Sequence, residues 1–251
     1  MFFSTAGERH NPVVILLHGA GLSDWSWQQA VQGLKEEYYV VTPVIDGHAQ
    51  AGSTTFISIQ NYAQQLIKYI DTEHQGKVFA MGGLSLGAQI VTEVLSQRAD
   101  ITRYAILESA LVYPIKSVVA LTVPSYKLCY GLINRRWFSK MQAKSLCVPS
   151  AMFEQYYQDS LQISRDSLIN ITLSNGTYAL QDAICATKAK VLVIVGEKEL
   201  GIMKKSARLL HQKIPNSRLF VAVKQKHGEW SLRHTSEYIQ QIKAFWQENE
   251  K

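Results

Sequence analysis

The stretch KVFAMGGLSLG, residues 77–87, decides the fold because it joins an apolar run to a serine that lies between glycines. The run Lys77–Leu84 predicts a strand, and Leu86–Gln97 predicts a helix, with Ser85 at their junction. The last five residues form a G-x-S-x-G pattern, whose glycines remove side chains that would clash in a tight, strained turn. Such a turn exposes the serine hydroxyl, so we interpret Ser85 as a nucleophile. A glycine-rich packing turn without chemistry is the alternative.

Apolar runs alternate with amphipathic stretches on both sides of this turn. Further strands are predicted at Val13–Leu17, Tyr39–Val44, Tyr104–Leu107, Val191–Val195 and Arg218–Val223, and helices from Ser23 or Asp24 to Leu34, at Ile59–Glu73, Lys205–Gln212 and Ser236–Gln247. Short, continuous apolar runs are typical of strands that are buried on both faces. Strands that alternate with helices predict an α/β fold, with a mostly parallel central sheet flanked by helices.

A long segment between Leu107 and Val191 contains no clear buried strand. Its content is helical and aromatic, and the aromatic residues are Tyr126, Tyr130, Trp137, Phe138, Phe153, Tyr156 and Tyr157. Because so long a structureless loop is uncommon in a compact domain, we expect a helical cap at residues 112–188. The α/β core then consists of residues 1–111 and 189–251. The cap would cover the carboxyl edge of the sheet, where its aromatic side chains line a substrate pocket or hold the cap helices together.

A second glycine-rich turn, His18-Gly19-Ala20-Gly21, follows the first strong strand. Its glycines allow backbone N–H groups to face a ligand. Together with the N–H of the residue after the nucleophile, such a loop forms an oxyanion hole. The predicted donors are the backbone N–H groups of Ala20 and Leu86, and the alternative is a simple strand–helix turn. We expect His18 to brace the loop rather than to react.

These motifs together resemble the α/β-hydrolase superfamily, and the resemblance covers nearly the whole chain outside the insertion. It is carried by His18-Gly19-Ala20-Gly21, Asp46-Gly47-His48, Gly83-Leu84-Ser85-Leu86-Gly87, Val195-Gly196-Glu197-Lys198-Glu199 and Lys226-His227-Gly228. The resemblance implies the order serine, acid, histidine along the chain. It also implies an antiparallel N-terminal hairpin, which the short stretch before Val13 would leave truncated or partly missing.

The resemblance places the general base at His227, in a loop between the last predicted strand and the final helix. A serine hydroxyl is a poor nucleophile until a neighbouring imidazole takes its proton. His234, seven residues further on, is the competing candidate. We interpret His48 as structural.

The acid that orients the imidazole is predicted to be Glu199, where the family usually has an aspartate. A glutamate can play this part if its additional methylene is accommodated. Glu108 is the alternative acid, because it follows the strand Tyr104–Leu107, where some members of the family place theirs. Glu197 is a third candidate. For each of the three, the alternative is a solvent-exposed carboxylate without a role in the reaction.

The implied function is that of a cofactor-free serine hydrolase. We expect it to cleave a carboxylic ester of a small or medium apolar substrate, through an acyl-enzyme on Ser85. The same residues would serve thioester or C–C bond hydrolysis or a lyase step, and a binding protein or receptor without turnover is a further alternative. The sequence has no metal-ligand spacing, no G-x-G-x-x-G pattern and no Walker lysine, so neither a metal nor a nucleotide cofactor is expected.

Positive charge is concentrated in the second half of the chain. Residues 1–125 hold 7 Lys and Arg against 10 Asp and Glu, and residues 126–251 hold 19 against 10, so the net charge of +6 divides into −3 and +9. Five cations, Lys127, Arg135, Arg136, Lys140 and Lys144, lie in one cap window without an acid. The window would steer an anionic substrate, rest on a lipid interface, or form an ordinary solvated face. The sequence contains no recognised nucleic-acid-binding motif, so nucleic-acid binding is not expected.

Composition bounds the remaining possibilities. Of the 251 residues, 47% are hydrophobic and 18% are charged, which supplies a core and excludes a largely disordered chain. The longest aliphatic run, Val13–Leu17, is far short of the roughly 20 residues of a spanning helix. The N-terminal residues do not have the pattern of a signal peptide, and three cysteines without motif spacing favour reduced, buried thiols. We therefore expect a cytoplasmic monomer or homodimer that acts on a small molecule.

Overall fold

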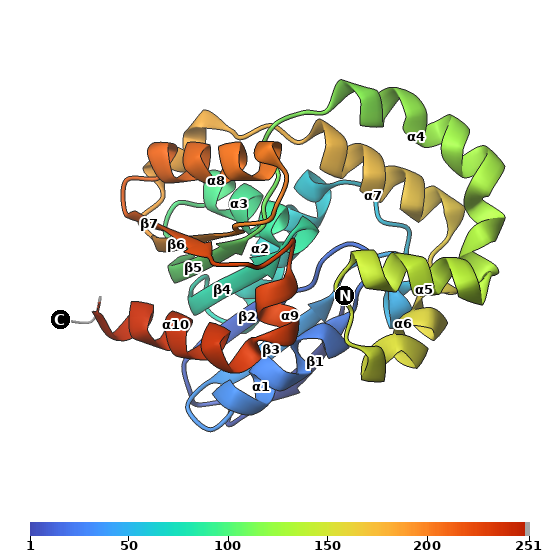
Figure 1. Ribbon diagram of the computed structural model, residues 1–251. Coiled ribbons are helices and arrows are strands. Elements are labelled where there is room, and N and C mark those ends of the chain that lie inside the picture. Colours follow the sequence, from blue (N-terminus) through green and yellow to red (C-terminus); the bar gives the residue numbers. More distant parts are fainter. Residues whose placement is uncertain (249–251) are drawn as a thin grey trace.

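The computed structural model describes residues 1–248, apart from the side chain of Val119, and is built on a seven-stranded sheet (Figure 1). The strands are β1 (Phe2–Ala6), β2 (Val13–Leu17), β3 (Tyr39–Val44), β4 (Val78–Leu84), β5 (Thr102–Glu108), β6 (Lys190–Gly196) and β7 (Ser217–Ala222). Their order is β1-β3-β2-β4-β5-β6-β7, and only β1 is antiparallel to its neighbour. The predicted α/β fold with a mostly parallel sheet is confirmed.

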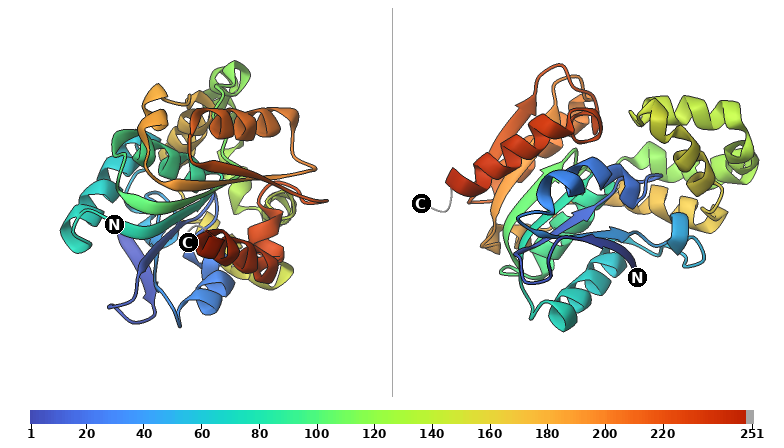
Figure 2. Two further views of the ribbon diagram at one scale, coloured as in Figure 1. Left: turned by 90° about the vertical axis from the view of Figure 1, so that its left-hand side faces the viewer. Right: turned by 90° about the horizontal axis from the view of Figure 1, so that it is seen from below.

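Helices cover both faces of the sheet (Figure 2), which explains why the strands are continuous apolar runs. On one face lie α2 (Ile59–Glu73), α3 (Leu86–Gln97) and α8 (Gly201–Lys213), and on the other α1 (Gln28–Leu34), α9 (Glu229–Arg233) and α10 (Thr235–Glu248). Successive residues of one strand pack alternately against the helices on the two faces of the sheet. In β2, Ile15 and Leu17 pack toward α2 and α3, whereas Val14 and Leu16 pack toward α1 and α10.

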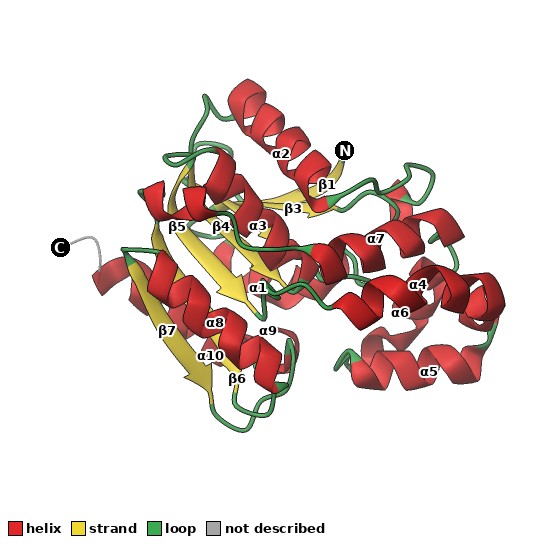
Figure 3. Cartoon of the chain, turned by 90° about the horizontal axis from the view of Figure 1, so that it is seen from above, coloured by secondary structure: helices red, strands yellow, loops and turns green. Residues whose placement is uncertain are grey.

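Helices also fill the long segment between β5 and β6, and Figure 3 shows them gathered on the side toward which β4 and β5 point. They are α4 (Lys116–Cys129), α5 (Arg136–Ser145), α6 (Phe153–Ser160) and α7 (Arg165–Thr177), with short 3-10 turns between α4 and α5 and between α5 and α6. Helix α4 packs against α7, and α5 packs against α6. No helix within residues 1–248 has the length and apolarity needed to cross a bilayer.

The structure corrects the sequence analysis at three points. The N-terminal residues form a strand, Phe2–Ala6, that pairs antiparallel with β3 and was not predicted as a strand. The helix expected from Ser23 or Asp24 is divided into a 3-10 turn, Asp24–Trp27, and α1, and the Ser23 hydroxyl donates to Asp24 Oδ1 instead of capping. The expectation of buried thiols is wrong for Cys129 and Cys185, which are exposed; all three cysteines are free.

Helix α3 approaches the end of β2 so closely that only a glycine fits at position 87. A Cβ built on Gly87 would lie 2.3 Å from the carbonyl oxygen of Leu17 and 2.7 Å from that of His18. Both atoms belong to the backbone and cannot rotate away. The glycine therefore sets the distance between the Ser85 turn and the loop that begins at His18.

We predict that Gly87→Ala destabilises the protein even though alanine is the better helix former. The helical preference would gain about 1 kcal/mol, but the overlap with backbone costs on the order of 1–3 kcal/mol or more. The matched control is Gly131→Ala, because a Cβ there meets no atom within 4 Å. Urea unfolding of both variants tests this, and equal stabilities would contradict it.

Candidate active site

Ser85 occupies a strained turn between β4 and α3. Its backbone lies in the left-handed region, with φ +54° and ψ −111°, which costs a residue other than glycine about 1–3 kcal/mol. The turn is held by its N–H, which donates to the carbonyl oxygen of Glu108 on the neighbouring strand (N···O 2.8 Å). A Cβ on Gly83 would lie 2.3 Å from the backbone carbon of Gly87, so both glycines of the predicted motif are sterically required.

His227 approaches Ser85 from the loop after β7. Its Nε2 atom lies 3.0 Å from Ser85 Oγ, and its side chain is 38% exposed, so solvent reaches the imidazole. The next residue, Gly228, has φ +66°, and a Cβ there would lie 2.9 Å from a methyl carbon of Leu84. The loop can therefore pass close to the end of β4 only with glycine at this position.

Glu199 contacts the other side of the imidazole. Its Oε2 lies 2.8 Å from His227 Nδ1, while its Oε1 accepts from the Gly196 N–H (2.7 Å) and from the Ser109 hydroxyl (2.8 Å). Burial by itself would raise the pKa of this carboxyl, but the hydrogen bond and charge of His227 and the two further donors lower the pKa below its ordinary value. Glu199 is therefore held ionised in a fixed orientation.

The loops that carry Glu199 and His227 touch because of a glycine at the end of β6. A Cβ on Gly196 would lie 2.5 Å from the carbonyl oxygen of Gln225 and 2.8 Å from that of Lys226. The Lys198 N–H also donates to the Gln225 carbonyl oxygen (2.9 Å). The two loops are therefore joined through backbone atoms, and this contact brings the Glu199 carboxylate to the imidazole.

The structure brings together three of the residues predicted for the site and leaves the competing candidates apart. The Glu197 carboxylate accepts from the Lys224 N–H, and none of its described contacts involves His227. His234 lies at the end of α9, and its described contacts do not include Ser85. The alternative acid, Glu108, serves the turn through its backbone carbonyl, and its side chain points to another partner.

Glu108 is a buried carboxyl without an ion-pair partner among the described residues. Its Oε1 accepts from the Ser231 N–H at 3.3 Å, whereas its Oε2 and the buried hydroxyl of Tyr238 have no hydrogen-bond partner within residues 1–248. Burial raises the pKa of Glu108 to about 7, and the negative charge of Glu199 adds to this more weakly. Near neutral pH much of the population therefore carries a neutral carboxylic acid here.

Two buried histidines support the loop that contains Ala20. His18 Nε2 accepts from the Ile45 N–H (3.0 Å), and His48 Nε2 accepts from the Gly21 N–H (3.1 Å). Burial lowers the pKa of His18 to about 3 and that of His48 to about 4, so both are neutral acceptors. Because the Gly21 N–H already donates to His48, it is not free to donate to a ligand.

The predicted oxyanion donors remain available. The described backbone hydrogen bonds of residues 1–248 give neither the Ala20 nor the Leu86 N–H a protein acceptor. Leu86 is the first residue of α3, whose N-terminal N–H groups have no partner within the helix. Both groups can therefore donate to an oxygen atom that a bound molecule supplies.

Ser109 belongs to the site but was missed in the sequence analysis. It follows β5 with φ +57°, is buried, donates to Glu199, and accepts weakly from the Gly228 N–H (3.4 Å). Its hydroxyl thus links the loops of the acid and of the histidine. Only its position directly after Glu108 at the end of a parallel strand was a signal in the sequence.

A cavity of about 390 Å³ extends from Ala20 and Gly21 into the helices between β5 and β6. Its walls are mainly apolar and include Phe138, Tyr156 and Ile171, and the residues that line it contain no Asp or Glu. Of the aromatic residues singled out in the sequence, Tyr126, Phe138 and Tyr156 line the cavity. Across residues 1–248, no group of three or more His, Cys, Asp or Glu is placed to hold a metal ion.

Comparison with known proteins agrees with this architecture. A family model described as serine aminopeptidase, S33, matches residues 8–228. The pimeloyl-[acyl-carrier protein] methyl ester esterase of Vibrio vulnificus (strain YJ016) is 29% identical over 100 residues, which is 40% of this chain and 36% of that esterase. The matched region thus spans only about a third of the length of this curated relative.

Solved structures share the fold over nearly the whole chain. An esterase from Exiguobacterium antarcticum has a TM-score of 0.81 and 16% identity, and the match covers 98% of this chain and 95% of that one. The enol-lactonase from Burkholderia xenovorans LB400 has a TM-score of 0.80 and 17% identity, with 97% and 95% covered. At these identities the likeness concerns the fold alone.

The environment of Glu108 predicts a pH-dependent stability that Glu108→Gln removes. Between the ordinary carboxyl pKa of 4.5 and the folded value of about 7, the unfolded chain loses a proton that the folded protein keeps. The free energy of unfolding therefore falls as pH rises through this range, by on the order of 3 kcal/mol in total. We predict that the variant gains stability relative to the wild type between pH 4.5 and pH 8.

Urea unfolding at several pH values measures this gain. The low pKa values of His18 and His48 act in the opposite direction, but they are common to both proteins and cancel in the difference. Glu197→Gln, at an exposed carboxylate, is the control and should follow the wild type. A pH-independent difference between wild type and Glu108→Gln would contradict the prediction.

Proposed function

The chain belongs to the serine aminopeptidase S33 family of α/β-hydrolases, and on this premise we propose that it is a serine hydrolase that cleaves a carboxylic ester. The observation that carries the proposal is the continuous line of contacts from Glu199 through His227 to Ser85, with distances of 2.8 and 3.0 Å. Each of these distances is within the reach needed for proton transfer and orientation.

In the proposed reaction, Ser85 Oγ attacks the ester carbonyl carbon while His227 Nε2 takes the hydroxyl proton. The Ala20 and Leu86 N–H groups donate to the oxyanion, and each is worth about 3–4 kcal/mol in the transition state. The imidazolium then gives its proton to the leaving alcohol as the C–O bond breaks. A water molecule, deprotonated by His227, attacks the acyl-enzyme and releases the acid and free Ser85.

The other residues of the site position this machinery. Glu199 stabilises the imidazolium and keeps the proton of the resting imidazole on Nδ1. Ser109 and the Gly196 N–H hold the second carboxylate oxygen, so the additional methylene of a glutamate is accommodated without loss of orientation. His48 occupies the Gly21 N–H and thereby fixes the loop that presents Ala20.

An ester is favoured over a peptide by the lining of the cavity next to Ala20. An aminopeptidase binds the ammonium group of its substrate, and a carboxylate is the usual partner for such a cation. The residues that line the cavity include no Asp or Glu, and their apolar surface suits an acyl chain. The curated relative named above is also described as a methyl ester esterase.

We predict that a fluorophosphonate probe labels the wild type and not Ser85→Ala. Glu199→Gln should lower kcat by about 10³–10⁴-fold, because the imidazole loses the partner that sets its tautomer. Glu108→Gln is the matched control, since it makes the same change in a buried carboxyl that does not contact His227, and it should stay within about tenfold of the wild type. Labelling measured by mass spectrometry and the hydrolysis of p-nitrophenyl butyrate test these expectations.

The outcomes separate the alternatives. A binding protein without turnover would hydrolyse no ester and leave Ser85 unlabelled. If Glu108→Gln were the more damaging substitution, Glu108 would be the acid. Labelling without hydrolysis of oxygen esters would point to a thioester, a C–C bond or a lyase step.

The apolar cavity predicts a preference for acyl chains longer than acetyl. Each methylene that enters it contributes about 0.8 kcal/mol, so kcat/KM for p-nitrophenyl esters should rise about fourfold per carbon until the cavity is full. Leu168→Trp places bulk in the wall and should shift the optimum to shorter chains. Leu128→Trp makes the same change at a side chain that is 86% exposed and should not shift the optimum. Flat rates across the series would reject this cavity as the acyl site.

A further inference from the structure

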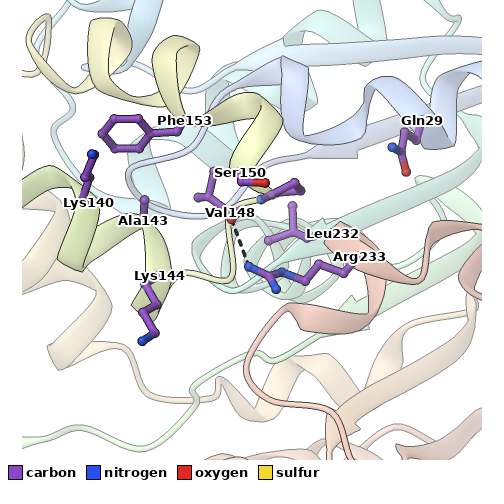
Figure 4. Close-up of a pocket in the computed structure, with 10 residues that line it drawn as sticks. Gln29, Lys140, Ala143, Lys144, Val148, Ser150, Phe153, Leu232 and Arg233 are labelled. Atoms are coloured by element: carbon purple, nitrogen blue, oxygen red, sulfur yellow. Dashed lines mark hydrogen bonds between the residues drawn. The ribbon is translucent and has the colours of Figure 1, made fainter.

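A second and larger cavity, of about 660 Å³, lies between the inserted helices and the core, and Figure 4 shows it. Helix α5 supplies Lys140 and Lys144 to its wall, and α9 supplies Arg233. The two lysines are four residues apart and therefore share one face of α5. Three cationic residues thus line one hollow.

Arg233 is fixed in the cavity by hydrogen bonds that use only part of its guanidinium. Its Nε donates to the carbonyl oxygen of Cys147 (2.8 Å) and its Nη2 to that of Val148 (3.1 Å), and Figure 4 shows the second of these bonds. A guanidinium has five N–H donors, so three remain. A cation that is held in place with free donors is preorganised for an anion.

No described carboxylate neutralises these cations. The sequence contains no Asp or Glu between Glu108 and Glu154. Glu154 is already paired with Arg136, and Glu229, which lies near Cys147, accepts from the Lys226 N–H. Within residues 1–248, neither Lys140 nor Lys144 forms an ion pair, and Lys140 has only the ring of Phe153 as a described partner.

The rest of the wall is apolar. It includes Val148, Pro149, Phe153 and Leu232, next to the polar side chains of Gln29 and Ser150. A free inorganic ion would fill only a small part of this volume and would leave the apolar wall in contact with water. The lining suits a ligand that has both a charged group and an apolar body.

We infer that this cavity binds an organic phosphate monoester, with the phosphate between Arg233 and the two lysines and the apolar part against Phe153 and Leu232. A phosphate dianion matches three cations better than a carboxylate does, and a guanidinium pairs with it through two parallel N–H bonds. The site is separate from the proposed ester site. The cavity beside Ala20 is lined by other residues of α5, including Phe138 and Gln142.

The test is isothermal titration calorimetry with octyl phosphate, below its micelle concentration, on the full chain. We expect Lys140→Ser/Lys144→Ser to weaken binding at least tenfold, because two charged partners are lost. Lys116→Ser/Lys127→Ser removes the same charge from exposed positions outside the cavity and should change affinity less than twofold. Ser85→Ala should bind as the wild type does, and binding should weaken as NaCl rises.

Three results would overturn the inference. Equal affinities of the two double variants would show that only the overall charge matters. Competition between octyl phosphate and the p-nitrophenyl esters, with binding insensitive to the lysine pair, would place the probe in the cavity beside Ala20. Binding of octanoate or octanol as tight as that of octyl phosphate would reject a phosphate site. Thermal unfolding of each variant, expected to be unchanged because both lysines are exposed, verifies that the variants are folded.

Discussion

The site depends on one backbone hydrogen bond, from the Ser85 N–H to the carbonyl oxygen of Glu108. It closes the last pair of residues between β4 and β5, where Leu84 lies opposite Glu108, and holds a serine in the left-handed region. The strain of about 1–3 kcal/mol must be offset elsewhere. The offset comes from a rigid scaffold, because β4 and α3 are buried and Gly83 and Gly87 allow their backbones to touch. The serine hydroxyl consequently stands at the edge of the sheet, within reach of His227.

The sequence predicts those strands and turns whose local residue pattern reflects their surroundings in the folded protein. The strands β2, β4 and β6 are apolar because both faces are buried, and the turn at Ser85 has its glycines where backbone atoms would otherwise clash. The strand Phe2–Ala6 escaped prediction because it lies at the sheet edge and is mostly exposed, so it has no buried pattern. Ser109 escaped because its partners come from loops about 90 and 120 residues further along the chain.

The pKa values of two buried carboxyls near Ser85 are shifted in opposite directions, and their hydrogen-bond donors explain the difference. Both Glu108 and Glu199 are buried, and burial opposes the charge of each. Glu199 receives hydrogen bonds from an imidazole, a hydroxyl and a backbone N–H, whereas the Glu108 side chain accepts a long bond (3.3 Å) from the Ser231 N–H. Desolvation is therefore overcome at Glu199 and prevails at Glu108. The residue type and the position in the sequence do not predict which of the two pKa values is raised. The hydrogen-bond donors that the fold brings to each carboxyl decide it.

Helix α5 separates two environments of opposite character. The residues that it contributes to the cavity beside Ala20 are uncharged, among them Phe138, whereas those that it contributes to the outer cavity include Lys140 and Lys144. The bonds from Arg233 to the carbonyl oxygens after α5 join this helix to α9, which begins two residues after His227. An anion bound between α5 and α9 would therefore hold α5, which forms a wall of the cavity beside Ala20, against α9, which follows His227. These three cations lie apart from the apolar cavity beside Ala20, in which the acyl chain of an ester would bind.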